Sequence, residues 1–103
     1  MLAELGYLLA TAPRTLSLET ALWRAIASLP RLQLCGSQKD YLGRTGIGIC
    51  AGTQQQTELL IATKPLEVLA VEQRILRRSP WYPGISPGTV VESDTFAPYH
   101  ASL

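Results

Sequence analysis

The sequence predicts an α+β fold in which one or two N-terminal helices pack on an antiparallel meander sheet of about five strands. Before residue 30, apolar residues recur at steps of three and four, which is typical of amphipathic helices. After residue 30, they alternate with polar residues or run in short stretches between turn signals, which is typical of strands. A chain of 103 residues fits one core. We therefore expect one domain over residues 1–103, with helices within 2–29, a sheet within 31–96 and a tail over 97–103.

The first helix is predicted over residues 2–11. Its leucines and alanines fall at helical spacing, and Pro13 ends the run. Gly6 weighs against this helix, because glycine costs a helix interior about 1 kcal/mol relative to alanine. We expect a short amphipathic helix here.

The second helix, over residues 15–29, has stronger signals. Thr15 or Ser17 can cap its N-terminus, and Glu19 places negative charge in the first turn, where it suits the helix dipole. The apolar stripe is broad enough to cover one face of a sheet. Trp23 lies at the edge of this stripe, so it is either the margin of the core or a ligand contact.

Three strands are predicted over residues 32–39, 46–52 and 57–63, and a turn at 42–46 joins the first two. In the second strand isoleucines alternate with glycines, so one face of that strand is nearly bare. Such a face occurs where another backbone, a helix or a ligand approaches closely, and we expect a helix to pack on it. The apolar run in the third strand indicates a central strand that is covered on both faces.

Residues 64–78 fit two patterns. Pro65 could open a helix with a partial apolar stripe, but the same residues also alternate as a strand would. The period alone does not decide between them. Three prolines and two glycines make residues 79–88 a loop. A last strand is expected over 89–96.

This predicted loop carries the best candidates for ligand contact. Trp81 and Tyr82 stand between prolines, which leave the loop little conformational freedom to lose on binding, and Ile85 follows them. Trp23 and Tyr41 are weaker candidates. Charged residues make up only 17% of the chain, below the roughly 25% of average soluble domains, so some apolar side chains are expected to face outward.

The residues that catalysis, cofactors and metals require are missing. His100 is the only histidine, so a serine hydrolase would lack a positioned base, and no motif supports Asp40 and Asp94 as a carboxylate pair. The glycines at 43–52 do not match a nucleotide-binding pattern, and two cysteines with one distant histidine are too few metal ligands. Nine basic and eight acidic residues create no field that would attract a nucleic acid. We expect a non-enzymatic protein with no cofactor, no metal and no nucleic-acid partner.

Cys35 and Cys50 lie on neighbouring predicted strands. If paired residues in this hairpin sum to an odd number near 85 or 87, the two sulfur atoms share a face, whereas an even sum puts them on opposite faces. Two free thiols and a disulfide are both compatible with the sequence. A disulfide would favour an exported protein.

Arg74, Arg77 and Arg78 form the one basic cluster of the sequence. It is either a solvated strand end or a contact for anionic lipid headgroups or an acidic ligand. No run approaches the roughly 20 apolar residues of a membrane span, and the N-terminus lacks the positive region of a signal peptide. The chain is therefore either cytoplasmic or the mature part of an exported protein.

Three stretches of the sequence resemble the C-terminal domain of a family of uncharacterised actinobacterial envelope proteins. They are LWRAIASLP at 22–30, DYLGRTGIGI at 40–49 and ELLI at 58–61. In that family an aspartate-proline turn and a leucine-rich strand occupy the place of residues 63–69, so the resemblance implies a strand over 67–77. This chain lacks the aspartate of that turn. Members usually carry a membrane anchor ahead of this domain, and some are encoded near extracytoplasmic-function sigma factors.

The resemblance and the composition together favour a binding module on the outer side of a cell membrane, held there by an anchor outside the numbered chain. The expected ligand is hydrophobic or peptide-like. Small lipoproteins that protect producers of antimicrobial peptides, including lantibiotics, are similar in size and organisation, so self-resistance is the specific function that we expect. The alternative is a sensor domain of an envelope protein that works with a sigma factor.

Overall fold

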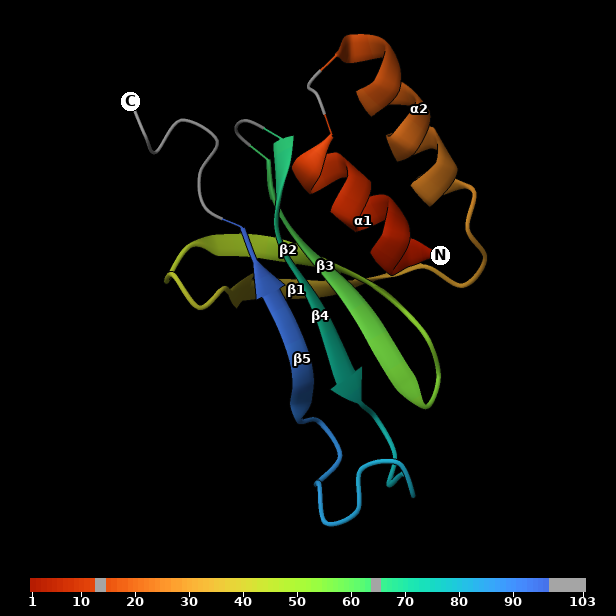
Figure 1. Ribbon diagram of the computed structural model, residues 1–103, viewed down its shortest axis with the longest axis vertical. Coiled ribbons are helices and arrows are strands. Elements are labelled where there is room, and N and C mark those ends of the chain that lie inside the picture. The colour runs from red at the N-terminus through yellow and green to blue at the C-terminus, as the bar shows by residue number, and fades with distance from the viewer. Residues whose placement is uncertain (13–14, 64–65, 97–103) are drawn as a thin grey trace.

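The structure, a computed structural model, describes residues 1–12, 15–63 and 66–96 (Figure 1). Two helices precede a single antiparallel sheet whose strands are ordered as in the sequence. The elements are α1 (Leu2–Thr11), α2 (Leu16–Ala27), β1 (Gln33–Lys39), β2 (Thr45–Ala51), β3 (Gln55–Thr63), β4 (Leu66–Ile75) and β5 (Val90–Thr95). The predicted α+β meander is therefore confirmed. The tail over 97–103, with His100, lies outside the described residues.

The region between 64 and 78, which periodicity left open, contains strand β4 and not a helix. β4 pairs with β3 along its whole length and with β5 along its second half. Its central residues are buried on both faces. The strand that the family resemblance implied over 67–77 is thus confirmed, with an end two residues earlier.

The main apolar core lies between the sheet and α1. Leu59, Ile61 and Val71 point from the sheet toward buried leucines of α1. A Cβ atom at Gly6 would overlap the side chain of Leu59, so the glycine that weakens the helix also lets it approach the sheet closely. Tyr7 extends this contact to β5, where its hydroxyl donates a hydrogen bond to Asp94.

The two helices share this core unequally. α1 lies directly on β3 and β4, whereas α2 packs mainly on α1 through Leu22 and Ile26. We expected the broad stripe of α2 to cover a sheet face, and that prediction is wrong. Leu16 and Leu18 stay exposed at the start of α2. The shorter helix takes the sheet because Gly6 allows the closer packing. Of the two predicted caps, Thr15 and Ser17, it is Thr15 that caps α2, by accepting a hydrogen bond from the Leu18 amide.

The second face of the sheet has no helix on it in the described part of the chain. The sheet twists so strongly that β1 and β2 run across β4 and β5, as Figure 1 shows. The glycines of β2 face this side. A Cβ atom at Gly46 would lie 2.6 Å from the carbonyl oxygen of Ile61 and 3.0 Å from Leu69. The prediction that a helix packs on the bare face of β2 is therefore wrong, because the sheet's own side chains and backbone fill it.

The turn between β1 and β2 holds the hairpin in this position. Asp40 accepts hydrogen bonds from the amides of Leu42 (2.9 Å) and Arg44 (2.8 Å) and from the Arg44 Nε atom (2.6 Å). Arg44 then donates from Nη2 to the backbone carbonyls of Leu69 and Phe96. Arg44, held by Asp40, therefore ties the first hairpin to β4 and to the residue that follows β5.

Candidate functional site

The loop between β4 and β5 holds Trp81 out in solvent. Figure 1 shows this loop at the end of the molecule remote from the helices. The Trp81 side chain is 85% exposed, the largest value among the exposed large hydrophobic residues of the described chain. Tyr82 and Ile85 are half-buried in the same loop. The three best candidates for ligand contact therefore share one segment, and only Trp81 is fully accessible.

Hydrogen bonds fix the loop at its base and along its length. At the base, Ile75 and Thr89 pair (3.0 Å), and the Gly88 amide donates to the Ile75 carbonyl (2.6 Å). Arg74 Nη1 adds a bond of 2.8 Å to the Gly88 carbonyl. Inside the loop, the Ser79 side chain accepts from the Trp81 amide at 3.2 Å. A loop with this many internal bonds loses little entropy when a ligand binds.

Two hollows flank this loop. One, of about 360 Å³, lies beside Trp81 and is also lined by Arg77, Arg78 and the start of β3. The other, of about 270 Å³, is lined by Tyr82 and Ile85 with the prolines of the loop. The predicted contacts thus border two adjoining hollows and not a single closed pocket.

The two weaker candidates lie elsewhere. Trp23 is half-buried against the main core, and with Leu16 and Leu66 it lines a hollow of about 430 Å³ beside α2. Tyr41 is 73% exposed in the turn between β1 and β2. The five residues predicted from the sequence therefore fall into three separate regions, of which the loop holds three members.

The predicted basic cluster is divided in the same way. Arg74 turns inward and binds the Gly88 carbonyl, Gln38 and Glu58. Arg77 and Arg78 are exposed beside Trp81. Only these last two are available to an acidic group on a ligand.

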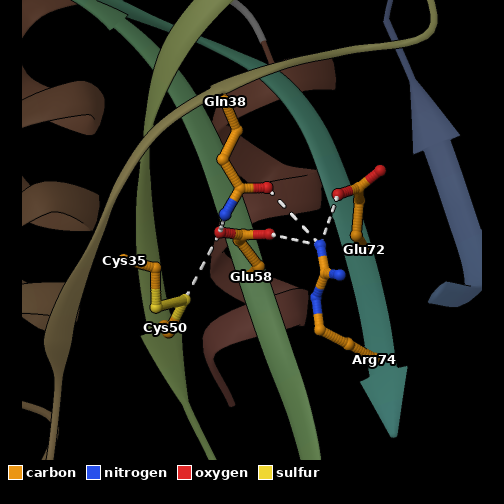
Figure 2. The surroundings of a disulfide bond; sticks show 6 residues. All are labelled: Cys35, Gln38, Cys50, Glu58, Glu72 and Arg74. Carbon is orange, nitrogen blue, oxygen red and sulfur yellow. Dashed lines mark hydrogen bonds and ion pairs between the residues drawn. A yellow bond between two sulfur atoms is a disulfide. The ribbon is translucent and has the colours of Figure 1, made fainter. Parts of the chain in front are cut away.

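A second cluster, which the sequence did not reveal, lies on the helix-free face (Figure 2). Glu58 has a side chain that is only 1% exposed. Its Oε2 atom accepts a hydrogen bond of 2.7 Å from Gln38, and its Oε1 atom lies 3.4 Å from Arg74 Nη2. Arg74 also lies 4.0 Å from Glu72, which accepts from Ser93 at 3.1 Å. Four of the five strands contribute to this network within the described residues.

Burial raises the pKa of Glu58 above its ordinary value of 4.5, and the Arg74 guanidinium opposes this shift only in part. Glu72 adds to the rise, because its like charge faces Glu58 from the neighbouring strand. Asp40 behaves in the opposite way. Burial works to raise its pKa, but the hydrogen bonds and charge of Arg44 outweigh burial and hold the pKa below 3.8.

A disulfide joins Cys35 to Cys50 beside this carboxylate, with a Cα–Cα distance of 6.1 Å. Pairing sums are 83 at Gln33 and Leu34 and change to 84 after a bulge, so Cys35 sits at the register shift. Before the bulge the sum of paired residue numbers is odd, and an odd sum puts both sulfur atoms on one face, as predicted from the sequence. Of the two possibilities that the sequence allowed, the structure has the disulfide.

The disulfide and the carboxylate meet in the space that Gly48 leaves open. A Cβ atom at this position would overlap Glu58 Oε2 and lie 3.3 Å from the Cβ atom of Cys35. Glu58 Oε2 lies 3.5 Å from Cys50 Sγ. The glycine is therefore required for the carboxylate to reach the sulfur, which is a sequence signal that becomes readable only when the strand register is known.

The cluster of Cys35, Cys50 and Glu58 and the pair Asp40 and Asp94 do not have the arrangement that a metal site or a hydrolase site needs. Cys35, Cys50 and Glu58 have ligand atoms within 4.8 Å of one another, but the disulfide leaves neither sulfur as the thiolate that binds metals. Asp40 and Asp94 serve different partners, Arg44 and Tyr7. None of the helices in residues 1–12, 15–63 and 66–96 has the length and apolar character that crossing a membrane requires.

Comparison of the chain with models of protein families, with curated proteins and with solved structures gives no match.

Proposed function

We propose that this chain is a non-catalytic binding module that takes a hydrophobic or peptide-like ligand through the loop around Trp81. The observation that carries this proposal is the position of Trp81, which is 85% exposed in a loop fixed by hydrogen bonds. Removing a large apolar side chain from water stabilises a complex by roughly 1.5–3 kcal/mol. The hydrogen bonds of the loop fix the backbone at Trp81, so little backbone entropy is lost on binding, and an aromatic side chain has only two torsion angles to order.

The charges near Trp81 narrow the class of ligand. Arg77 and Arg78 are exposed and line the same hollow. A guanidinium group pairs well with a carboxylate or phosphate and repels a cation. We therefore propose a ligand that presents an apolar side chain next to a neutral or anionic group, and a peptide with a free carboxylate meets this description.

The disulfide supports a location outside the cytoplasm, since disulfides persist in oxidising compartments and are rare in the cytosol. We propose that the module acts at the outer face of the membrane, where an anchor holds it close to peptides that approach the bilayer. Self-resistance to an antimicrobial peptide is the role that we propose for it there, because binding the peptide keeps its apolar side chains from the lipid.

Titration of the isotope-labelled protein tests the binding proposal. The probes are a short tryptophan-containing peptide with a free carboxylate, its C-terminal amide, a cationic amphipathic peptide, and phosphatidylcholine vesicles with and without phosphatidylglycerol. We expect amide shifts at residues 80–86 with the carboxylate peptide and weaker ones with its amide. Trp81→Ala should weaken binding by about 1.5–3 kcal/mol, or roughly 10- to 150-fold.

Tyr41→Ala is the matched control, because it removes an aromatic side chain that is similarly exposed in a different region. It should leave the affinity unchanged. Shifts confined to residues 16–27 would place the site in the hollow beside α2 and reject the loop. If no probe shifts residues 80–86, the proposal is wrong. Where binding is found, expression of the protein should raise the tolerance of a sensitive host to the peptide, and Trp81→Ala should abolish this protection.

A further inference from the structure

We propose that the Cys35–Cys50 disulfide is a thiol–disulfide exchange site, at which a dithiol attacks Cys35 and Glu58 exchanges a proton with Cys50. The inference goes beyond ligand binding at the loop and rests on a different part of the molecule. It follows from three features of the cluster in Figure 2: unequal access to the two sulfur atoms, the contact between Cys50 and a buried carboxylate, and the absence of a side chain at Gly48.

Access decides which sulfur atom is attacked. Cys35 is half-buried on β1, an edge strand of the sheet, whereas Cys50 is completely buried on β2. A thiolate must approach the sulfur that it attacks, and the other sulfur leaves as a thiolate. Attack at Cys35 Sγ therefore makes Cys50 the leaving group, inside a site that water does not reach.

A thiolate formed in such a site needs a proton or a cation, because burial strongly disfavours an isolated charge. Glu58 Oε2 lies 3.5 Å from Cys50 Sγ, on the residue directly opposite in the β2–β3 register. Because burial raises the pKa of Glu58, its carboxyl group keeps a proton at higher pH than an exposed glutamate does. Glu58 is thus a proton donor already in place beside the leaving sulfur.

The surroundings of Glu58 accept the product of that transfer. After the proton moves to Cys50, the new carboxylate accepts the hydrogen bond from Gln38 (2.7 Å) and forms an ion pair with Arg74 at 3.4 Å. The charged groups that face Glu58 are Arg74 and Glu72, both on β4. Arg74 and Glu72 keep their opposite charges throughout, so the ionisation of Glu58 gives the reduced state one negative charge more than the oxidised state beside Arg74.

Reduction of the disulfide takes two successive displacements at sulfur. A thiolate of the dithiol bonds to Cys35 Sγ, the bond between Cys35 and Cys50 breaks, and Cys50 takes its proton from Glu58. The second thiolate of the dithiol then attacks the other sulfur atom of the dithiol, which is bonded to Cys35 in the mixed disulfide. This step closes a cyclic disulfide and releases Cys35 as a thiolate. Two electrons pass from the dithiol to the protein. In the reverse reaction the cyclic disulfide takes two electrons from the protein, and the Glu58 carboxylate takes the proton back from Cys50.

Reduction by dithiothreitol, followed from pH 5.5 to 8.5 by quenching and mass spectrometry, tests the role of Glu58. The rate constant is calculated from the concentration of dithiothreitol thiolate at each pH, so that the ionisation of the reductant does not contribute to its pH dependence. We expect this constant to fall in the wild-type protein as rising pH removes the proton from Glu58. Glu58→Gln should be slower at pH 5.5, on the order of 100-fold, as loss of a general acid predicts, and should show no such fall.

Glu72→Gln is the matched control. It makes the same chemical change on a buried carboxylate that also faces Arg74 but does not contact the disulfide. It should still show a fall of the rate constant with rising pH, but at lower pH than in the wild-type protein, because the charge of Glu72 helps to raise the pKa of Glu58. If the two variants are reduced alike, or if the wild-type constant does not change with pH, Glu58 has no part in the exchange and the proposal is overturned.

A second measurement uses only the wild-type protein and does not depend on the folding of a variant. The reduced protein is treated with less than one equivalent of iodoacetamide, and the modified cysteine is identified by peptide mapping. We expect Cys35 to be modified first, because it is the accessible sulfur. Faster modification of Cys50 would contradict the assignment of Cys35 as the attacked residue.

Discussion

The two faces of this sheet are both covered, but different chemistry covers them. Toward α1, the contacts are apolar, and leucines of the helix meet Leu59 and Val71 of the sheet. On the opposite face the described chain has no helix, and Glu58, Arg74 and Gln38 form a hydrogen-bonded network beside a disulfide. One face is stabilised by the area that it removes from water, and the other by a small apolar cluster, Leu60, Leu69 and Ala70, together with specific pairs of polar groups.

This difference has consequences for how each face responds to change. Apolar contacts are non-directional, so the loss of one side chain costs the area that it buried and the cavity that it leaves, but creates no unpaired charge. A buried charge without its partner is destabilising, so each member of the polar network depends on the others. The helix-covered face should therefore tolerate conservative substitution, whereas the polar face should respond to changes of charge and redox state.

The largest effect is expected on the apolar face. Leu59 is completely buried between β3 and α1, and Leu59→Ala should lower the free energy of unfolding by about 3–4 kcal/mol through lost burial and the cavity left behind. Urea unfolding followed by circular dichroism measures this. Leu34→Ala, at a leucine that is 76% exposed, should change stability by less than about 0.5 kcal/mol. Equal losses in both variants would contradict the assignment of the core.

Reduction of the disulfide should give the next largest effect. The bond closes a loop with a sequence separation of 15 residues, and a loop of that size predicts about 3 kcal/mol of stability from the restricted unfolded chain. Thermal unfolding with and without dithiothreitol measures the loss. The double substitution Cys35→Ser with Cys50→Ser should be similarly destabilised and insensitive to the reductant. An unchanged midpoint in the wild-type protein would show that the bond contributes nothing.

Asp40→Ala should cost about 2 kcal/mol, because Arg44 loses its charged partner and the turn loses three hydrogen bonds. The pKa of Asp40 is lowered from 3.8, so the stability that it provides is present above pH 3.8 and is lost as pH falls through the lower pKa of the folded state. The difference between wild type and variant should therefore shrink in acid. Glu92→Ala, at an exposed carboxylate, is the control.

The smallest effect is expected at the edge of the apolar face. Tyr7→Phe removes the hydrogen bond to Asp94 and should cost about 0.5 kcal/mol, since Tyr7 is 37% exposed and water competes for the bond. This bond, aided by burial, raises the pKa of Tyr7 from 10.0 to about 12. Its contribution is full below pH 10 and is lost as pH rises through about 12.

Spectrophotometric titration checks the position of this pKa. One tyrosine should ionise near pH 12 in the wild-type protein, and Tyr7→Phe should remove that step. Tyr41→Phe, at a tyrosine that is 73% exposed, should leave it in place. A high-pH step that survives Tyr7→Phe would show that the hydrogen bond to Asp94 is not formed in solution.

Local patterns in the sequence were sufficient to predict both helices and four of the five strands, whereas they left β4 open between helix and strand. The meander follows from short loops and from runs that alternate apolar and polar residues, and the prolines before and after Trp81 predicted its loop. Three of the five candidate contacts lie in that loop. Trp23 and Tyr41 do not join them, because side chains on separate elements come together only through the packing of those elements.

The role of Glu58 cannot be predicted from local patterns in the sequence. In the sequence it opens an apolar run and looks like the polar end of a central strand. Its role follows from the register that puts it opposite Cys50 and from the empty position at Gly48. Neither is encoded within a few residues of Glu58, and the bulge at Cys35 changes the parity of the pairing within the same hairpin.

The sequence by itself therefore determined the class of fold, the strand order and the segment that displays Trp81, since these depend on propensities and periods that act over a few residues. Only the tertiary structure decided that α1 and not α2 lies on the sheet. It also decided that the hairpin of β1 and β2 covers the second face, and that the two cysteines meet a buried carboxylate. These outcomes depend on the twist and register of the sheet. Every strand contributes a little to both, so no single stretch of the sequence predicts them.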